Sequence, residues 1–249
     1  MKELHKATQT ALSVIHPEWL KYFQTPLAGK SLVDLLDETI IKVIATGHKL
    51  CPDHPSKILN CFAEDPNNIK VVICGMDPYP QPGIATGYAF ACGNKFQPSL
   101  NIMVRELAQE CGDLSLGIDT PFDGSLRSWV DQGVMLLNTS LSTQEFNAGA
   151  HTELWRDFMN TLFWMLNDMK LSRESMNSMV FVFLGKQAQS YAGNVSELLH
   201  FKIMRNHPAA ETHGNAKFVG FYNEVNKCLE ESGQDKINWI TNAQKQEEG

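Results

Sequence analysis

The sequence predicts a single α/β domain with a central four-stranded, mostly parallel, twisted sheet that is flanked by helices on both faces. Four short apolar runs of strand length alternate along the chain with longer segments of helical periodicity, which is the pattern of such a sheet. The chain has 249 residues, of which 43% are hydrophobic and 20% charged, so one sizeable core is expected.

The first predicted helix covers residues 31–47. Its apolar side chains recur at helical spacing, and Ser31 can cap it with Asp34 three residues on. The same periodicity predicts helices over residues 99–111, 151–168 and 215–231.

The helix expected over residues 99–111 begins with a residue type that favours helix starts. We expect Ser99 to be its N-cap. We also expect Arg105 and Glu106 to face solvent.

The four expected strands are short runs rich in β-branched or large apolar residues. They cover residues 70–75, 134–137, 179–184 and 201–204. Parallel sheets of this class bind ligands beyond the carboxyl ends of their strands. The residues that follow the runs include Asp77, Asn138, Gly185 and His207, so an acid, an amide, a glycine-initiated turn and a histidine are expected on one rim.

The charge of the chain limits how it can bind nucleic acid. The formal net charge is −7, which argues against broad, sequence-independent coating of DNA, because such binding needs excess Lys and Arg. A small local cationic patch is compatible with this charge. Lys202, Arg205, His213 and Lys217 give one region a positive bias, although an ordinary solvated surface explains these charges equally well.

The ends of the chain and its cysteines indicate the compartment. Residues 1–24 lack the apolar core of a secretory signal, and no run approaches the roughly 18 apolar residues of a membrane span. The six cysteines form no C-x-x-C pair, so buried, reduced thiols are expected rather than disulfides or a metal site. We expect an intracellular protein, nuclear or cytoplasmic, or one encoded by a virus and acting in the host cell, with no membrane contact.

We expect one domain over residues 1–239, followed by a polar tail over residues 240–249. Gly29-Lys30-Ser31 resembles the end of a phosphate-binding loop. Gln24 stands where that loop needs glycine, so a nucleotide hydrolase is excluded.

Seven segments resemble, in order and approximate spacing, the motifs of family 1 uracil-DNA glycosylases. The first is Gly75-Met76-Asp77-Pro78-Tyr79-Pro80, whose usual family form is G-Q-D-P-Y-H. The others are GYAF at 87–90, PSLNI at 98–102, QGVMLLN at 132–138, AH at 150–151 with WRDF at 155–158, VFLG at 182–185 with AQ at 188–189, and HP at 207–208. Each segment alone is a weak signal. Seven in register, from about residue 51 to residue 239, are specific, and the chain is identified as a divergent member of this family.

The resemblance implies the uracil-DNA glycosylase fold and an activity on uracil-containing DNA. The enzyme would flip the uracil nucleotide out of the DNA, hydrolyse its N-glycosidic bond, release free uracil and leave an abasic site for base excision repair. No metal or organic cofactor is implied. We expect a monomer, with replication proteins as an open alternative among its partners.

The implied catalytic residues are Asp77 and His207. Asp77 would place a negative charge near the sugar and position the attacking water. His207, in its neutral form, would donate a hydrogen bond to uracil O2 as that oxygen gains charge.

The implied uracil-binding residues are Met76, Tyr79, Phe90 and Asn138. Phe90 would stack on the base, and the Asn138 amide would match uracil O4 and N3–H. Tyr79 would fill the space of a thymine methyl, and the backbone N–H of Met76 would help to hold O2. The implied DNA-binding residues are Pro98, Ser99, Gly185, Lys186, Pro208 and Ala209.

Four positions depart from the family pattern. Met76 replaces glutamine, and Pro80 replaces histidine, as it also does in the poxvirus branch of the family. Ala209 replaces a phosphate-contacting serine, and Glu211 stands where the family has its leucine wedge. Because an apolar plug normally offsets unstacking and a carboxylate repels phosphates, we predict weak duplex binding and a preference for single-stranded uracil.

Three alternatives stay open beside this interpretation. A glycosylase-like replication accessory module with reduced catalysis would account for the acidic charge and the altered DNA-gripping loops. A glycosylase of another branch is disfavoured, since Tyr79 argues against thymine and four clustered cysteines are absent. A doubly wound protein for some small ligand would leave the ordered motifs unexplained.

Overall fold

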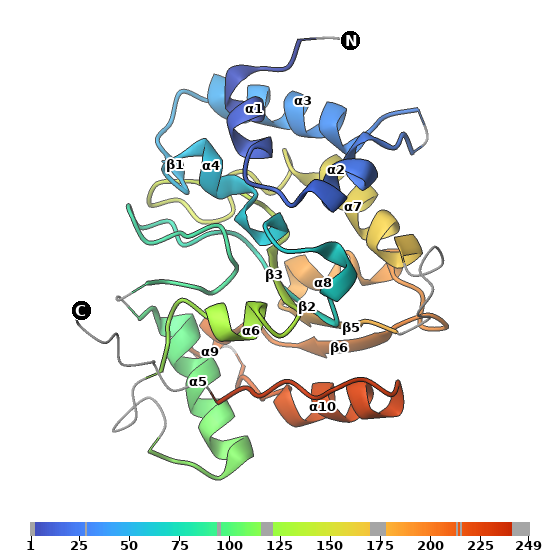
Figure 1. Cartoon of the computed structure of the whole chain (residues 1–249). Helices are drawn as coiled ribbons and strands as arrows, with labels where there is room; N and C mark the ends of the chain where they lie inside the picture. The colour runs from blue at the N-terminus through green and yellow to red at the C-terminus, as the bar shows by residue number, and fades with distance from the viewer. Residues whose placement is uncertain are drawn as a thin grey trace, which may run out of the picture.

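The computed structural model describes residues 3–27, 29–93, 96–115, 122–169, 178–212, 214 and 216–240. A four-stranded sheet with the order β3-β2-β5-β6 lies at its centre, and every neighbouring pair in it is parallel. Helices cover both faces of this sheet (Figure 1). The predicted fold class is therefore confirmed.

The four strands coincide with the four apolar runs of the sequence. They are β2 (Val71–Gly75), β3 (Val134–Asn138), β5 (Val180–Leu184) and β6 (Phe201–Arg205). Every residue of β2, β3 and β5 is buried. A strand covered on both faces needs apolar side chains pointing both ways, which explains why these runs are continuously apolar rather than alternating.

Successive side chains of β2, β3 and β5 enter different cores. Val72, Cys74, Leu137 and Phe183 belong to one cluster of buried residues. Val71, Ile73, Leu136 and Val182 belong to a second cluster on the opposite face. The sheet is therefore a shared wall, and its strands are held from both sides.

Different helices cover the two faces of the sheet (Figure 1). The first cluster contains residues of α1 (Lys6–Leu12), α2 (Pro17–Gln24), α3 (Leu32–Ala45) and α7 (Arg156–Asp168). The second cluster contains residues of α5 (Pro98–Cys111), α6 (Arg127–Val130) and α10 (Tyr222–Glu231).

Short elements complete the described chain. A two-stranded antiparallel sheet pairs β1 (Leu50–Cys51) with β4 (Thr143–Gln144). The remaining helical turns are α4 (Pro55–Ile58), η1 (Asn60–Phe62), η2 (Pro66–Asn68), α8 (Lys186–Gln189), η4 (Ala192–Asn194) and α9 (Pro208–Thr212). Three of these, α8, α9 and β4, lie just beyond the carboxyl ends of the central strands in sequence.

Two helix starts were predicted incorrectly. The helix expected from residue 151 begins at Arg156, because residues 151–155 form a turn in which the buried His151 bonds to Ser142. The helix expected from residue 215 begins at Tyr222, and residues 216–220 are not helical. The Ser31 cap is confirmed, with the full reciprocal bonding to Asp34.

The expectations for the start and exposed face of α5 were also partly wrong. Gln97 is the N-cap and Pro98 is the first helical residue, so Ser99 lies inside the first turn. Arg105 is exposed, as expected, whereas Glu106 is 6% exposed because Arg105 covers and binds it.

Three further expectations concern the cysteines, membrane spans and the end of the domain. Four of the six cysteines are buried, whereas Cys111 is exposed and Cys228 is partly exposed; all six are free thiols. Among the described residues, no helix is both long enough and apolar enough to cross a bilayer. The described core extends to Trp239, which is 4% exposed. Residues 241–249 lie outside the described residues, so the domain boundary at 239 stays a prediction.

Candidate active site

A cavity of about 150 Å³ lies at the carboxyl ends of the central strands. It brings together the acid, the amide and the histidine that the sequence placed on one rim. Its lining residues are Met76, Asp77, Pro78, Tyr79, Pro80, Ala85, Tyr88, Phe90, Ser99, Asn138, Ala148, His207 and Ala209. Both predicted catalytic residues and all four predicted uracil-binding residues are in this set.

The loop after β2 is fixed to the loop after β3. The backbone N–H groups of Thr139 and Ser140 donate to the carbonyls of Gly75 and Met76 at 3.0 and 2.9 Å. The Thr139 hydroxyl lies 3.2 Å from the carbonyl of Gly75. The pairing of the two strands therefore continues past their ends, and it holds the start of the Asp77 loop in place.

Asp77 lies at the floor of the cavity and is tied to a third segment. Its carboxylate accepts a hydrogen bond from the backbone N–H of Gly149. Burial raises the pKa of the Asp77 carboxyl above its ordinary value, and the hydrogen bond from Gly149 acts in the opposite direction. The structure thus holds a desolvated carboxylate in one orientation.

Asn138 ends β3 and directs its amide into the cavity. The residue is 6% exposed, and its amide makes no side-chain hydrogen bond within the part of the chain that the structure describes. A Cβ at Gly75 would lie 2.6 Å from Asn138 Oδ1, so only glycine leaves room for the amide on the neighbouring strand. A buried amide without a protein partner is a donor and acceptor pair for a ligand.

Phe90 forms a flat apolar wall of the cavity. Its φ is 64°, an uncommon backbone conformation for a bulky residue, and its side chain is 6% exposed. The hydroxyl of Tyr79 donates to the Phe90 carbonyl at 3.0 Å, which fixes both rings. The Phe90 ring lies 5.7 Å from the imidazole of His207, centroid to centroid.

His207 is neutral near pH 7, and the structure defines its tautomer. Burial lowers the pKa of its imidazole to about 4. Nδ1 accepts a hydrogen bond from the backbone N–H of Ala209 at 3.1 Å, so the single ring proton is on Nε2. Within the described residues Nε2 has no partner, and it is therefore a free donor at the cavity.

Gly185 makes room for this histidine. It has a φ of 88°, and a Cβ there would lie 2.8 Å from the Cβ of His207. Glycine is thus required both by the turn and by the close approach. The turn also positions Lys186, the first residue of α8, which is exposed.

The six predicted DNA-binding residues divide into two groups. Ser99 and Ala209 line the cavity. Pro98, Gly185, Lys186 and Pro208 do not line it. Pro98 and Pro208 are chain neighbours of residues that do, and Gly185 lies against His207.

The expected positive bias of the surface is partly neutralised. Lys202 pairs with Glu197 at 3.0 Å, and Arg205 forms an ion pair with Glu224. Lys217 is exposed. His213 lies outside the described residues.

Glu211, at the position of the family's wedge, is bound rather than free. Its two carboxylate oxygens accept hydrogen bonds from the Arg105 guanidinium at 2.7 and 2.9 Å, and Oε2 also accepts the backbone N–H of Phe218 at 2.9 Å. The bonds from Arg105, followed by the one from Phe218, lower the pKa of the Glu211 carboxyl to about 2. The negative charge of Glu211 is therefore balanced by the Arg105 guanidinium.

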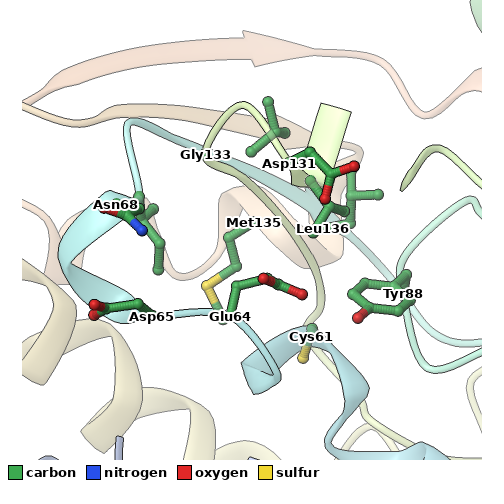
Figure 2. A pocket seen from close by; sticks show the side chains of 12 residues that line it. Cys61, Glu64, Asp65, Asn68, Tyr88, Asp131, Gly133, Met135 and Leu136 are labelled. Atoms are coloured by element: carbon green, nitrogen blue, oxygen red, sulfur yellow. The ribbon is translucent and has the colours of Figure 1, made fainter. Parts of the chain in front are cut away.

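A second hollow of about 100 Å³ lies at the other end of β2 and β3 (Figure 2). Three acidic side chains, Glu64, Asp65 and Asp131, surround it. Arg127 pairs with Glu64 at 2.7 Å and with Asp131 at 2.6 Å. Among the described residues no three metal-ligating side chains come together, so this hollow offers no ligand set for a metal ion.

Sequence reasoning missed the contribution of the segment after β3. Ala148 lines the cavity and Gly149 holds Asp77. The available signal was position, because this segment also follows the carboxyl end of a central strand.

Comparisons with known proteins agree with the fold. The model of the "Uracil DNA glycosylase superfamily" matches residues 62–230. A uracil-DNA glycosylase of Aliivibrio salmonicida (strain LFI1238) is 33% identical over 199 residues, which cover 78% of this chain and 84% of that protein. One from Pseudomonas aeruginosa (strain UCBPP-PA14) is 32% identical over 215 residues, covering 84% and 88%.

A solved structure supports the same fold. The crystal structure of mimivirus uracil-DNA glycosylase matches with a TM-score of 0.76 at 23% identity, covering 92% of this chain and 88% of that chain. The chain belongs to the uracil DNA glycosylase superfamily. The resemblance drawn from its seven segments is thereby confirmed.

Proposed function

We propose that this protein is a hydrolase that removes uracil from DNA by cleaving the bond between the base and deoxyribose. One observation carries the proposal. A single cavity of about 150 Å³ gathers an aromatic wall, an unpartnered buried amide, a neutral histidine with a free N–H, and a partly buried carboxylate. These are the groups that bind a flat polar base and stabilise charge on either side of its glycosidic bond.

Uracil recognition is assigned to Phe90 and Asn138. The base stacks on Phe90, and the Asn138 amide donates to O4 and accepts from N3–H. Cytosine presents the opposite donor and acceptor pattern at this edge, so it would leave buried groups unpaired and be rejected strongly. The freedom of the Asn138 amide from protein partners supports this role.

Exclusion of thymine is assigned to Tyr79. The ring lines the cavity and is anchored by its hydroxyl to the Phe90 carbonyl at 3.0 Å. An anchored ring cannot swing aside for an extra methyl at low cost, because packed interiors resist overpacking.

Bond cleavage is assigned to Asp77 and His207. As the C1′–N1 bond breaks, its electron pair leaves on the uracil and positive charge develops on the sugar. The Asp77 carboxylate stabilises that sugar charge, orients the water whose oxygen bonds to C1′, and accepts its proton. His207 Nε2–H and the backbone N–H of Met76 donate to uracil O2. Preorganised donors of this kind each contribute about 3 kcal/mol to transition-state stabilisation.

Binding of the DNA around the uracil nucleotide is assigned to Ser99, the Gly185-Lys186 turn and the segment that starts at Pro208. Ser99 and Ala209 at the cavity, and the exposed Lys186, support this placement. We propose that the protein acts as a monomer inside the cell, where its DNA substrate is found. The competing proposal is that the protein binds replication proteins as an accessory module with reduced catalysis.

The test is release of free uracil from a labelled single-stranded oligonucleotide. We expect Asp77→Asn to lower kcat by about 10²–10⁴-fold. We expect His207→Ala to lower it by about 10²–10³-fold. Leu198→Ala, at a side chain that is 96% exposed and does not line the cavity, is the matched control. Absence of release by the wild-type protein, with DNA binding intact, would favour an accessory module over an enzyme.

A further inference from the structure

Phe146 presents an aromatic ring to solvent, and its backbone is bonded to Pro80, which lines the cavity. Its side chain is 76% exposed. No aromatic ring among the described residues contacts it. Single exposed apolar side chains are common on soluble proteins, so the exposure of Phe146 does not by itself indicate a function.

The backbone of Phe146 supplies the second observation. Three non-glycine residues in the described chain have a positive φ, namely Phe90, Leu126 and Phe146. Phe90 and Leu126 are 6% and 1% exposed, so core packing offsets their strain. Phe146 has a φ of 61° without such packing. Strain that persists at a surface position is a signature of functional constraint.

Hydrogen bonds fix this strained residue to the cavity. The Phe146 N–H donates to the carbonyl of Pro80 at 2.9 Å, and Pro80 lines the cavity. Two residues further on, Ala148 lines the cavity, and Gly149 holds Asp77. The ring is thus mounted on the segment that positions the proposed catalytic carboxylate.

Phe146 lies in a short hairpin in which Gln144 pairs with Asn147, and hydrogen bonds hold this hairpin in place. The Glu145 N–H donates to the Lys49 carbonyl at 2.9 Å, and the Thr143 hydroxyl donates to the Asn147 carbonyl at 2.8 Å. The Lys49 side chain beside it is 84% exposed, with its ammonium 4.0 Å from the Glu145 carboxylate. An exposed aromatic side chain on a held backbone, with a lysine side chain on the neighbouring segment, is a combination that can bind single-stranded nucleic acid.

We propose that Phe146 is a stacking platform for the nucleobase next to the uracil nucleotide in a single DNA strand. This subsite rests on the proposed function and names its substrate class. A neighbouring base in a single strand is free to turn onto the ring, whereas in a duplex it is held by its own partner. The subsite also supplies apolar contact that Glu211, bound to Arg105, does not offer.

The experiment compares two single-stranded substrates. Both carry one uracil, and the second replaces the nucleotides on either side by abasic analogues. We expect Phe146→Ala to raise KM on the first substrate by about 5- to 150-fold, the range of one lost base stack, with little change in kcat. On the second substrate the variant and the wild type should be equal. Phe146→Trp should retain the wild-type KM on both.

Phe146→Gly separates stacking from support of the hairpin. Glycine removes the ring and also relieves the positive φ, so stacking predicts the same rise in KM as for alanine. If either variant instead lowers kcat on both substrates, Phe146 acts by holding the Asp77 segment, and the subsite is refuted. Leu198→Ala serves as the exposed apolar control.

Wild-type activity distinguishes the two proposals. If the wild type releases uracil and Phe146→Ala matches it on both substrates, the subsite fails and the proposed function stands. If the wild type releases no uracil, the proposed function fails, and the Kd of each labelled strand decides on the subsite. Tighter wild-type binding of the base-bearing strand, lost in Phe146→Ala, would then support the platform, and equal binding would overturn it.

Discussion

Arg105 of α5 and Glu211 of α9 form a two-point ion pair, with Nη1–Oε1 at 2.7 Å and Nη2–Oε2 at 2.9 Å. The pair joins two elements that each supply a cavity-lining residue, Ser99 and Ala209. It therefore changes the reason for expecting weak duplex binding. The carboxylate is balanced by the guanidinium, so what distinguishes this rim is the missing apolar wedge rather than an unpaired negative charge.

We predict faster uracil release from single strands than from duplex, and a rise in duplex activity in Glu211→Leu. An apolar side chain at this position can occupy the space of the flipped base, which offsets unstacking. Glu211→Gln is the control, because it also breaks the charge pair with Arg105 but adds no apolar wedge. The measurement is the ratio of kcat/KM on duplex and single-stranded substrates. An equal rise in both variants would attribute the effect to charge, and a wild type that cuts duplex faster would contradict the prediction.

The pKa of His207 predicts a pH dependence of stability. In the unfolded chain this histidine gains a proton near its ordinary pKa of 6.5, whereas in the folded chain it does so near pH 4. Between these values the unfolded state binds more protons, so the free energy of unfolding falls as pH falls through the window. Urea unfolding at pH 7 and at pH 4.5 should show a larger loss for the wild type than for His207→Gln. Equal losses would show that burial does not depress this pKa.

The same pKa predicts that His207 stays a neutral donor down to about pH 5. The kcat/KM profile should therefore lack an acid limb near pH 6.5, the pKa of an ordinary histidine. An acid limb near 6.5 that disappears in His207→Gln would contradict the assigned tautomer and role.

Gly185→Ala should impair catalysis more than folding. The added Cβ would lie 2.8 Å from the Cβ of His207 and would push the imidazole away from the base. A displacement of this size can lower the rate by about 10²-fold. Gly83→Ala is the matched control, because Gly83 also has a positive φ, 73°, and has open space around it. Both variants should lose about 1–3 kcal/mol of stability from backbone strain, and only Gly185→Ala should lose the rate.

Gly75→Ala should weaken binding of free uracil. Its Cβ would lie 2.6 Å from Asn138 Oδ1 and 3.1 Å from the Phe90 ring, so both proposed base contacts must shift. We expect the inhibition constant of free uracil to rise by about tenfold or more, corresponding to about 1.4 kcal/mol. Gly193→Ala is the control, since Gly193 has an ordinary φ and no neighbour within 4 Å. Unchanged inhibition would show that the cavity adapts to the added methyl.

The strands and the rim were predictable because their causes are local. A short, continuously apolar run indicates a strand covered on both faces, and the ends of parallel strands then gather whatever follows them. Asp77 and Asn138 come at the ends of such runs, His207 follows the fourth, mixed run, and the three meet in one cavity. Ser99 could have been placed correctly from its own neighbour, since Pro98 is typical of the first helical position.

The features that were missed depend on tertiary contacts. Residues 216–220 are held out of a helix in part by the bond from the Phe218 N–H to Glu211. Glu106 is buried because Arg105 binds it, which no periodicity reveals. The short helix α2 begins with a His16 cap, and histidine is not among the favoured capping residues.

The hydrogen bonds from Thr139 and Ser140 to Gly75 and Met76 extend the central parallel ladder into the loops that border the cavity. Amide hydrogens that close a central parallel ladder exchange with solvent only through global opening, unlike those of frayed loops. The amides of Thr139 and Ser140 should thus exchange as slowly as those of β2 and β3. Slow exchange of these amides would show that the ends of β2 and β3 do not open locally. Entry of the uracil would then depend on motion of the DNA rather than on motion of these two strand ends.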